Sequence, residues 1–375
     1  MTEVYRDGTR CVRAGLPAAQ PGQPFLAGPV LASTYQLDPV AGPTEGLDGY
    51  GRPDNPTRRA LEAAIGELEG GECVAFGSGM AAISAALFTL AGDSLVVPSD
   101  GYYQTRRFAA ESLVARGVTV RAVPTAGPYP SFVDVRLAVV ETPANPGLDV
   151  CDIAALAAAV HEAGGLLAVD NTTATPLGQR PLELGADLVV ASGTKALTGH
   201  SDLLLGYVCT GSAELAGRIR AWRNTTGAIP GAFDCWLAHR SLSTLDIRLA
   251  RQASNAAAVA ALLVSHPEVR RVRWPGLPSD PAYPLACRQM RRMPGVVTFE
   301  LASRARVERF LVASRLVAAA TSFGGTHTTA DRRAQWGDDT PEGLVRLSCG
   351  IEDPEDLVAD IAAALDVSID PPWDA

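Results

Sequence analysis

The sequence predicts an α/β protein, with a large domain built on a mostly parallel sheet and a smaller C-terminal α+β domain. From about residue 57, short apolar runs alternate with helix-like stretches, a pattern typical of a parallel sheet that helices cover on both faces. The length of 375 residues suits two domains. Hydrophobic residues make up 47% of the chain and charged residues 19%, so a sizeable buried core is expected.

The elements follow in order along the chain. Residues 1–48 are rich in Gly and Pro, show little periodicity, and are interpreted as an extended N-terminal arm. In the predicted large domain, residues 49–235, the patterns favour helices over 57–69, 80–90 and 152–163, and strands over 73–76, 95–98, 118–123, 137–140, 166–169 and 188–191. In the predicted small domain, residues 236–375, they favour helices over 236–265 and 354–365, and strands over 269–274, 296–301 and 345–349.

Reactive side chains follow three of the predicted parallel strands at the point where each strand ends. Glu141, Asp170 and the segment 192–195 each come directly after an apolar run. Open α/β sheets bind their ligands at the carboxyl ends of their strands. The sequence therefore predicts a functional site at this edge of the large sheet.

The chain contains a single lysine, Lys195, so the other 31 of its 32 basic residues are arginine. A guanidinium stays protonated, whereas a lysine amine can lose its proton and attack a carbonyl carbon. By itself the count is also compatible with an ordinary surface lysine. The preceding residues, Ser192-Gly193-Thr194, favour instead a lysine that forms a Schiff base with a carbonyl compound.

A glycine turn, Gly77-Ser78-Gly79-Met80, lies between a predicted strand and a predicted helix. Backbone N–H groups at such a helix start can bind a phosphate. The same segment fits the G-x-G-x-x-A dinucleotide pattern, with Asp100 about twenty residues later. Both a cofactor phosphate and a dinucleotide remain open at this point.

Composition and charge exclude several other classes. The formal charge of −9 gives no electrostatic support for binding nucleic acid. No apolar run approaches the roughly eighteen residues of a membrane span, and the N-terminus carries charges where a signal peptide would be apolar. The seven cysteines form no C-x-x-C pair, and the five histidines show no metal-binding spacing. We therefore expect a cytoplasmic protein without a metal site, a disulfide framework or a membrane partner.

An ordered set of motifs, spread from about residue 8 to residue 366, resembles the Cys/Met-metabolism (trans-sulfuration) family of pyridoxal-phosphate-dependent enzymes. The carrying segments are Tyr50-Gly51-Arg52, Asn55-Pro56-Thr57, residues 77–82, residues 141–146, Val169-Asp170-Asn171-Thr172, residues 192–195, residues 199–202, Ser322-Phe323-Gly324-Gly325 and Arg346-Leu347-Ser348. The resemblance implies the fold-type I, PLP-dependent transferase-like fold, pyridoxal 5′-phosphate as cofactor, and a homotetramer with shared active sites.

The resemblance also implies roles for individual residues. The catalytic residues would be Lys195, Tyr102, Asp170 and Tyr50. The cofactor would be bound by Lys195, Tyr50, Arg52, Gly79, Met80, Tyr102, Asp170, Ser192 and Thr194, with Tyr50 and Arg52 reaching it from a neighbouring subunit. Substrate would be bound by Asn145, Arg346, Arg107 and Ser322, with Arg107 at a distal carboxylate. Ordinary local roles remain open beside these, such as a helix cap for Asp170 and a solvated surface position for Arg52.

The implied activity is that of a carbon–sulfur lyase resembling cystathionine γ-lyase, which splits the thioether amino acid L-cystathionine into cysteine, 2-oxobutyrate and ammonia. A γ-replacement transferase, either a cystathionine γ-synthase or an O-acylhomoserine sulfhydrylase, is the main competing hypothesis. A β-elimination enzyme, an NAD-binding oxidoreductase and a non-catalytic homologue also remain open.

The chain departs from the family pattern at two places. Tyr103-Gln104 replaces the usual Gly-Gly, and Gln104 stands where methionine γ-lyases have cysteine, which disfavours that activity. His327 replaces a glutamate that lies near the distal end of the substrate in cystathionine-processing relatives. Distal specificity is thus open, and a change of His327 to glutamate is expected to improve selectivity for cystathionine.

Overall fold

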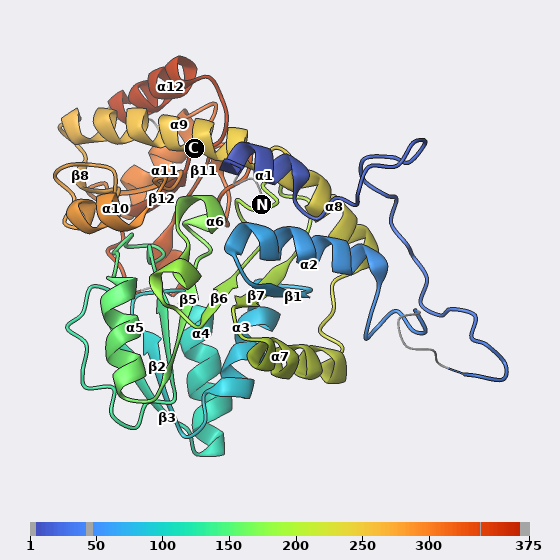
Figure 1. Cartoon of the computed structure of the whole chain (residues 1–375). Helices are drawn as coiled ribbons and strands as arrows, with labels where there is room; N and C mark the ends of the chain where they lie inside the picture. The colour runs from blue at the N-terminus through green and yellow to red at the C-terminus, as the bar shows by residue number, and fades with distance from the viewer. Residues whose placement is uncertain (1–4, 43–47, 338, 368–375) are drawn as a thin grey trace, which may run out of the picture.

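The computed structural model describes residues 5–42, 48–337 and 339–367. Two sheets organise this part of the chain (Figure 1). The larger sheet has seven strands in the order β1-β7-β6-β5-β4-β2-β3, and the smaller has five in the order β10-β11-β12-β9-β8. The protein therefore has the α/β architecture predicted from the sequence, with a second, smaller sheet domain.

The larger sheet is parallel except for β7, which runs antiparallel to its neighbours β1 and β6. Its strands are β1 (Glu72–Phe76), β2 (Ser94–Pro98), β3 (Thr119–Val123), β4 (Leu137–Glu141), β5 (Leu166–Asp170), β6 (Leu188–Ala191) and β7 (Gly206–Thr210). Because β4, β5 and β6 are parallel neighbours, their carboxyl ends meet at one edge of the sheet. This edge carries the site described below.

Helices cover the larger sheet on both faces. Alternate strand residues pack against α2 (Pro56–Glu69), α5 (Ile153–Glu162), α6 (Thr175–Gly178) and α8 (Ala232–Leu242) on one face. The other face packs against α3 (Gly79–Leu90), α4 (Tyr103–Phe108), η1 (Ala109–Leu113) and α7 (Ala213–Thr226). Two apolar layers thus hold the central strands, and every residue of β4 is buried.

Two of the differences from the sequence-based prediction concern β7 in the larger domain and the long helix predicted at the start of the smaller domain. Strand β7 was not predicted, because its segment Gly206–Thr210 begins with glycine. The structure shows why glycine is needed: a Cβ at Gly206 would lie 2.0 Å from the Ser78 carbonyl oxygen. The helix predicted over 236–265 is two helices, α8 and α9 (Leu245–Ser265). Between them the Ser243 hydroxyl donates to the Arg240 carbonyl, a local bond that competes with helix continuation.

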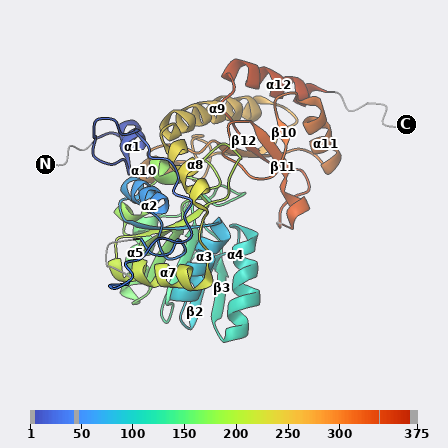
Figure 2. The same ribbon diagram turned by 90° about the vertical axis from the view of Figure 1, so that its right-hand side faces the viewer.

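The smaller sheet buries one face and presents the other to the larger domain (Figure 2). Its strands are β8 (Arg270–Arg273), β9 (Val296–Glu300), β10 (Ala318–Ala319), β11 (Thr329–Arg332) and β12 (Leu344–Ser348). Helices α9, α11 (Arg304–Ala313) and α12 (Pro354–Asp366) form an apolar core with Val345 and Leu347 of β12. Since side chains alternate along a strand, Arg346 points to the opposite face, level with Asp331 of β11.

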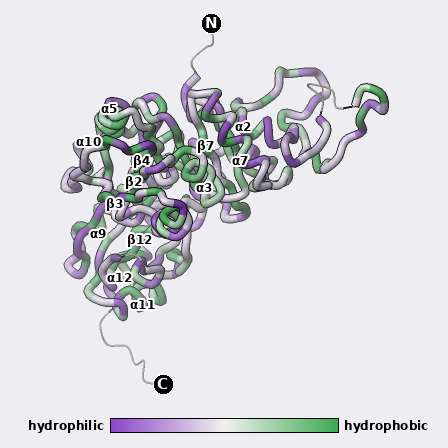
Figure 3. Tube along the Cα trace, turned by 90° about the horizontal axis from the view of Figure 1, so that it is seen from below, coloured by the Kyte–Doolittle hydropathy of each residue, from purple (hydrophilic) through white to green (hydrophobic). Residues whose placement is uncertain are grey.

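The N-terminal segment contains one helix, α1 (Asp7–Arg13), followed by irregular chain. Figure 3 shows part of this chain extending away from the body, with both hydrophobic and hydrophilic residues along it. Phe25 is 89% exposed and Val40 is 94% exposed. The predicted arm over residues 1–48 includes residues 1–4 and 43–47, which lie outside the described residues.

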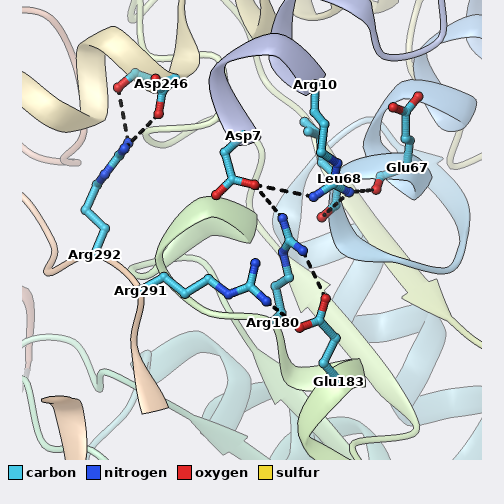
Figure 4. Close-up of polar contacts among 9 residues, drawn as sticks. All are labelled: Asp7, Arg10, Glu67, Leu68, Arg180, Glu183, Asp246, Arg291 and Arg292. Carbon is cyan, nitrogen blue, oxygen red and sulfur yellow. Dashed lines mark hydrogen bonds and ion pairs between the residues drawn. The ribbon is translucent and has the colours of Figure 1, made fainter. Parts of the chain in front are cut away.

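Ion pairs connect α1, the larger domain and the segment before β9 (Figure 4). Asp7 of α1 pairs with Arg180 at 2.6 Å, and Arg180 pairs with Glu183 of η3 (Pro181–Leu184) at 2.9 Å. Glu183 also pairs with Arg291, which follows α10 (Tyr283–Gln289). These pairs attach the small-domain chain to the edge of the large domain.

Candidate active site

A cavity of about 420 Å³ lies at the carboxyl ends of β4, β5 and β6, where the smaller sheet faces the larger one. The predicted site residues that line it are Gly79, Met80, Tyr102, Asn145, Asp170, Ser192, Thr194, Lys195, Ser322 and Arg346. These residues come from segments almost 270 positions apart in the chain, as the span from Gly79 to Arg346 shows. We call its strand-end part, Gly79, Asp170, Ser192, Thr194 and Lys195, the cofactor side.

Lys195 follows β6 after a tight turn, and its amine reaches across to the smaller domain. Thr194 fixes the turn, because its hydroxyl both donates to the Leu205 carbonyl (3.1 Å) and accepts from the Leu205 N–H (2.9 Å). The Lys195 Nζ donates to the Ser322 Oγ at 2.7 Å. Burial, together with the nearby guanidinium groups of Arg346 and Arg333, lowers the pKa of Lys195 to about 8. The amine is therefore able to exchange protons near neutral pH.

Ser322 connects the lysine to the substrate-binding arginine predicted from the sequence. Its φ of 75° is unusual for a residue with a side chain, and such conformations are concentrated at functional sites. The conformation brings its hydroxyl to Lys195 and its carbonyl oxygen to the Arg346 Nη2, at 2.9 Å. The Phe323 ring lies beside both cations, 5.4 Å from Lys195 Nζ and 5.1 Å from the Arg346 guanidinium carbon.

Two carboxyl groups end neighbouring strands at the floor of the cavity, since Glu141 of β4 is level with Asp170 of β5. Burial, together with the Asp170 charge, raises the pKa of Glu141 well above its usual value. Burial also raises the pKa of Asp170, against the opposing effects of Thr172 and Lys195. A cationic ring nitrogen facing Asp170 would favour its charged form.

Glu141 holds the two loops that carry Tyr102 and Asn145. Its Oε2 accepts from the Tyr102 N–H at 2.6 Å, and its Oε1 accepts from the Asn145 N–H at 2.9 Å. Tyr102 precedes α4 and remains 37% exposed, with its ring packed edge-on against Tyr103 at 5.3 Å. A flat aromatic side chain thus lies at the cavity with a fixed backbone.

The start of α3 has the features of an anion site. The N-cap Ser78 accepts from the Ala81 N–H at 3.1 Å, and the first turn of this 12-residue helix lines the cavity. Gly79 allows the turn after β6 to approach closely, because a Cβ at Gly79 would lie 2.7 Å from the Ser192 Cβ. Backbone N–H groups at this helix start, with the Ser192 and Thr194 side chains beside them, suit a phosphate.

Arg346 is held in place by contacts on three sides. Its Nη1 donates to the Asn145 Oδ1 at 2.7 Å, and its Nη2 donates to the Ser322 carbonyl oxygen at 2.9 Å and to the Asp331 Oδ2 at 3.3 Å. Its side chain is only 4% exposed. The guanidinium is thus oriented at the cavity, as two-point binding of a carboxylate requires.

Three predicted residues do not line this cavity. Tyr50 and Arg52 line a second cavity with Pro230 and Ala232, and the Arg52 guanidinium carbon lies 5.7 Å from the Tyr50 ring centre. Arg107 pairs with Glu111 on the surface at 2.8 Å, and both side chains are 62% exposed. The structure therefore leaves these three residues apart from Lys195 within one chain.

The structure adds three residues that the sequence analysis did not select. Asp331, Arg333 and Trp336 lie around Arg346, and the latter two line the cavity. With Ser322 and Arg346 they form what we call the substrate wall. Only one feature of the sequence pointed to this part of the chain, namely the departure from the family pattern after Gly325. Arg333 and Trp336 follow that departure closely.

Two further properties bear on the chemistry. Within residues 5–42, 48–337 and 339–367, no three His, Cys, Asp or Glu side chains are grouped so that they could hold a metal ion. None of the helices in this part of the chain combines the length and the apolar character needed to cross a bilayer.

Comparison with known proteins agrees with the geometry. Residues 9–366 match the family described as Cys/Met metabolism PLP-dependent enzyme. A putative cystathionine γ-lyase of Streptomyces coelicolor is 54% identical, over 96% of this chain and 93% of its own length. An L-methionine γ-lyase of Pseudomonas deceptionensis is 39% identical, over 95% and 96%. The crystal structure of cystathionine γ-synthase from Xanthomonas oryzae has 35% identity and a TM-score of 0.89, covering 96% of this chain and 98% of that one.

The residues present fit pyridoxal 5′-phosphate. The start of α3 with Ser192 and Thr194 suits its phosphate, Asp170 suits its ring nitrogen, Tyr102 offers a flat ring, and Lys195 supplies the amine. When bound, this cofactor withdraws electrons from the Cα atom of an amino acid. The glycine turn at residues 77–82 therefore belongs to a PLP enzyme, and this finding replaces the hypothesis of an NAD-binding oxidoreductase.

Proposed function

Because the chain belongs to the Cys/Met metabolism family of PLP-dependent enzymes, we propose that it is a carbon–sulfur lyase that performs γ-elimination on L-cystathionine. Cystathionine and water would give cysteine, 2-oxobutyrate and ammonia. The specific reaction is supported by the 54% identity to a putative cystathionine γ-lyase over nearly the whole length of both chains. The cytoplasm is the proposed location.

The observation that carries a lyase mechanism is the position of the Lys195 amine. It lies between Asp170 on the cofactor side and Ser322 on the substrate wall, with its pKa lowered to about 8 by burial and nearby guanidinium groups. In the proposed reaction, Lys195 would remove the Cα proton, pass it on to the bound cofactor, and then, as a free amine again, remove a Cβ proton. Tyr102, or Tyr50 of a neighbouring subunit, returns a proton to the departing sulfur. Arg346 and Asn145 hold the α-carboxylate during these steps.

A γ-replacement reaction is the second candidate, because the similar proteins include cystathionine γ-synthases such as the Xanthomonas enzyme. The two reactions share their first steps and differ in whether a thiol then adds to the carbon chain. Product analysis of the holoenzyme separates them. We expect the enzyme to form 2-oxobutyrate when cystathionine is the only substrate supplied. If it forms no 2-oxobutyrate but makes cystathionine from an O-acylhomoserine and cysteine, the replacement reaction is established.

We further propose a homotetramer in which Tyr50 and Arg52 complete a neighbouring active site. Two features support this proposal: both residues line a cavity without Lys195, and the chain near them exposes large apolar side chains, with Leu31 71% exposed. Apolar surface of this kind is typical of a subunit contact.

Mixed subunits test the shared site. Arg52→Ala and Lys195→Ala should each be inactive alone, but hybrids should contain some sites in which both residues are intact. We expect activity to return when the two proteins are dissociated and reassembled together. Reassembled hybrids, verified by mass, that stay inactive would contradict the shared site without affecting the assignment of Lys195.

A further inference from the structure

Two arginines of the small domain share one buried carboxylate beside the reacting amine. Arg333 begins η4 (Arg333–Trp336), directly after β11, and its Nη1 donates to the Asp331 Oδ2 at 3.0 Å. The Arg346 Nη2 donates to the same oxygen at 3.3 Å and lies 3.2 Å from the Asp331 Oδ1. The side chains of both arginines are 4% exposed and that of Asp331 is 3% exposed. The two guanidinium groups are therefore close neighbours on the substrate wall.

The charge of Arg333 reaches the groups that react. Besides burial, which is the main cause, Arg346 and Arg333 both lower the pKa of Lys195, against the smaller opposing effects of Asp331 and Asp170. The same two guanidinium groups act against the rise in the pKa of Tyr102 that burial and Tyr103 produce. Arg333 thus adds positive potential inside the cavity, where a second anionic group would be stabilised.

The position of η4 indicates which part of a substrate meets Arg333. The last residue of η4, Trp336, also lines the cavity and is 42% exposed, while its indole N–H donates to the Asp331 Oδ2 at 3.0 Å. The substrate wall therefore extends from the buried Arg346 past Arg333 towards solvent. An amino acid whose α-carboxylate lies at Arg346 has its side chain available to this outer part of the wall.

We propose that Arg333, with Trp336 beside it, binds a second carboxylate of the substrate, so that the enzyme selects dicarboxylic amino acids. The inference rests on the proposed function, because L-cystathionine carries such a second carboxylate. It assigns this role to Arg333 in place of Arg107, whose side chain is exposed and paired with Glu111. The planar guanidinium fork suits a carboxylate better than a point charge does.

Matched inhibitors test the proposal without requiring any particular reaction. L-2-aminoadipate and L-norleucine differ only in whether the chain ends in a carboxylate or a methyl group, and L-2-aminopimelate and L-2-aminoheptanoate repeat the comparison one carbon longer. Inhibition constants are measured on the holoenzyme with whichever substrate it turns over. We expect at least one dicarboxylate to bind about ten- to a hundredfold more tightly than its partner.

Arg333→Gln should abolish this preference, because it should weaken the binding of the two dicarboxylates far more than the binding of norleucine and 2-aminoheptanoate. Arg333→Lys should restore part of it, since the charge returns without the fork. Arg332→Gln is the matched control, because Arg332 pairs with Glu342 and does not line the cavity. The Arg332→Gln variant should prefer the dicarboxylates over their methyl-ended partners as strongly as the wild type does. Cofactor absorbance and the melting temperature verify that each variant is folded.

Three results would overturn the proposal. Equal weakening of both members of a pair in Arg333→Gln would mean that Arg333 only orients Arg346 through Asp331. A preference that survives in Arg333→Gln but is lost in Arg107→Ala would assign the carboxylate to Arg107. A wild-type enzyme with no preference would exclude the subsite altogether. If the preference depends on Arg333 while cystathionine yields no 2-oxobutyrate, the proposed lyase reaction fails and this inference stands.

Discussion

On the cofactor side of the cavity, the reactive groups follow neighbouring parallel strands, whereas the substrate wall comes from an antiparallel pair and a short 3-10 helix of the smaller domain. Asp170 and Lys195 are placed by the shared edge of one buried sheet. Arg346 and Arg333 are placed by side-chain contacts with Asp331. The first arrangement depends on backbone register, and the second depends on side-chain contacts, with Asp331 as the carboxylate that both arginines share.

This difference suggests that the two sides have different functions. A sheet edge fixed by hydrogen bonds and an apolar core provides constant geometry for one cofactor. A wall whose outer residues Arg333 and Trp336 lie in a short helix outside the sheets can change its charges without disturbing that geometry. We therefore expect changes on the cofactor side to abolish catalysis and changes on the substrate wall to alter the choice of substrate.

The largest expected effect is that of Lys195→Ala. Turnover should fall by many orders of magnitude because the proton-transferring amine and the covalent attachment are lost together. Lys195→Arg should be equally inactive, since a guanidinium keeps the charge but cannot accept a proton. Circular dichroism and melting temperature should show that both variants are folded. Turnover within about tenfold of wild type in either one would remove Lys195 from the mechanism.

A second prediction concerns the scaffold beneath the cofactor side. Glu69, the last residue of α2, is buried, and its Oε1 accepts from the Tyr207 hydroxyl of β7 at 2.7 Å. Burial raises the pKa of Glu69 from 4.5 to about 7, against the opposing effects of Tyr207, Asn171 and Arg180. Between these two values the unfolded chain releases the proton while the folded protein retains it. Folded-state stability should therefore decrease as the pH rises from about 4.5 to about 7.

Glu69→Gln removes this dependence because the amide keeps the shape and an acceptor for Tyr207 without ionising. The variant should gain stability relative to wild type as pH rises, reaching about 3 kcal/mol above pH 7. Denaturant unfolding of the holoenzyme from pH 5 to pH 8.5 measures the difference, with the exposed Glu67→Gln on the same helix as control. A constant difference across this range would show that Glu69 is ionised in the folded protein.

The same contrast explains how far the sequence could predict the molecule. The positions of Glu141, Asp170 and Lys195 after apolar runs were enough to predict a shared strand edge, because parallel strands end together. Asp331 was not recognised because strand β11 was not predicted, so its partnership with Arg346 across the sheet was hidden. The sequence also does not show which side chains are buried, because burial depends on the tertiary structure. Arg107 and Arg333 are both arginines in short helical segments, yet only Arg333 lines the cavity.

The smallest expected effect concerns His327, which tests where the substrate wall ends. The sequence alone predicts that His327→Glu improves selectivity for cystathionine, by restoring the glutamate of related enzymes. In the structure His327 is exposed and does not line the cavity, and its Nδ1 lies 3.3 Å from the Thr326 hydroxyl. The neighbouring Thr328 already donates its backbone N–H and hydroxyl to Glu352, at 2.6 and 2.7 Å.

A new carboxylate at position 327 would thus lie in solvent, where it has little influence on a bound substrate. We expect the ratio of kcat/KM for cystathionine to kcat/KM for homocysteine to change by no more than about twofold, the usual range of a surface substitution. Arg333→Gln, measured in the same assay, should lower this ratio far more. A tenfold increase of this ratio in His327→Glu would instead show that the segment after Gly325 contacts the substrate. The substrate wall would then extend beyond Arg333 and Trp336.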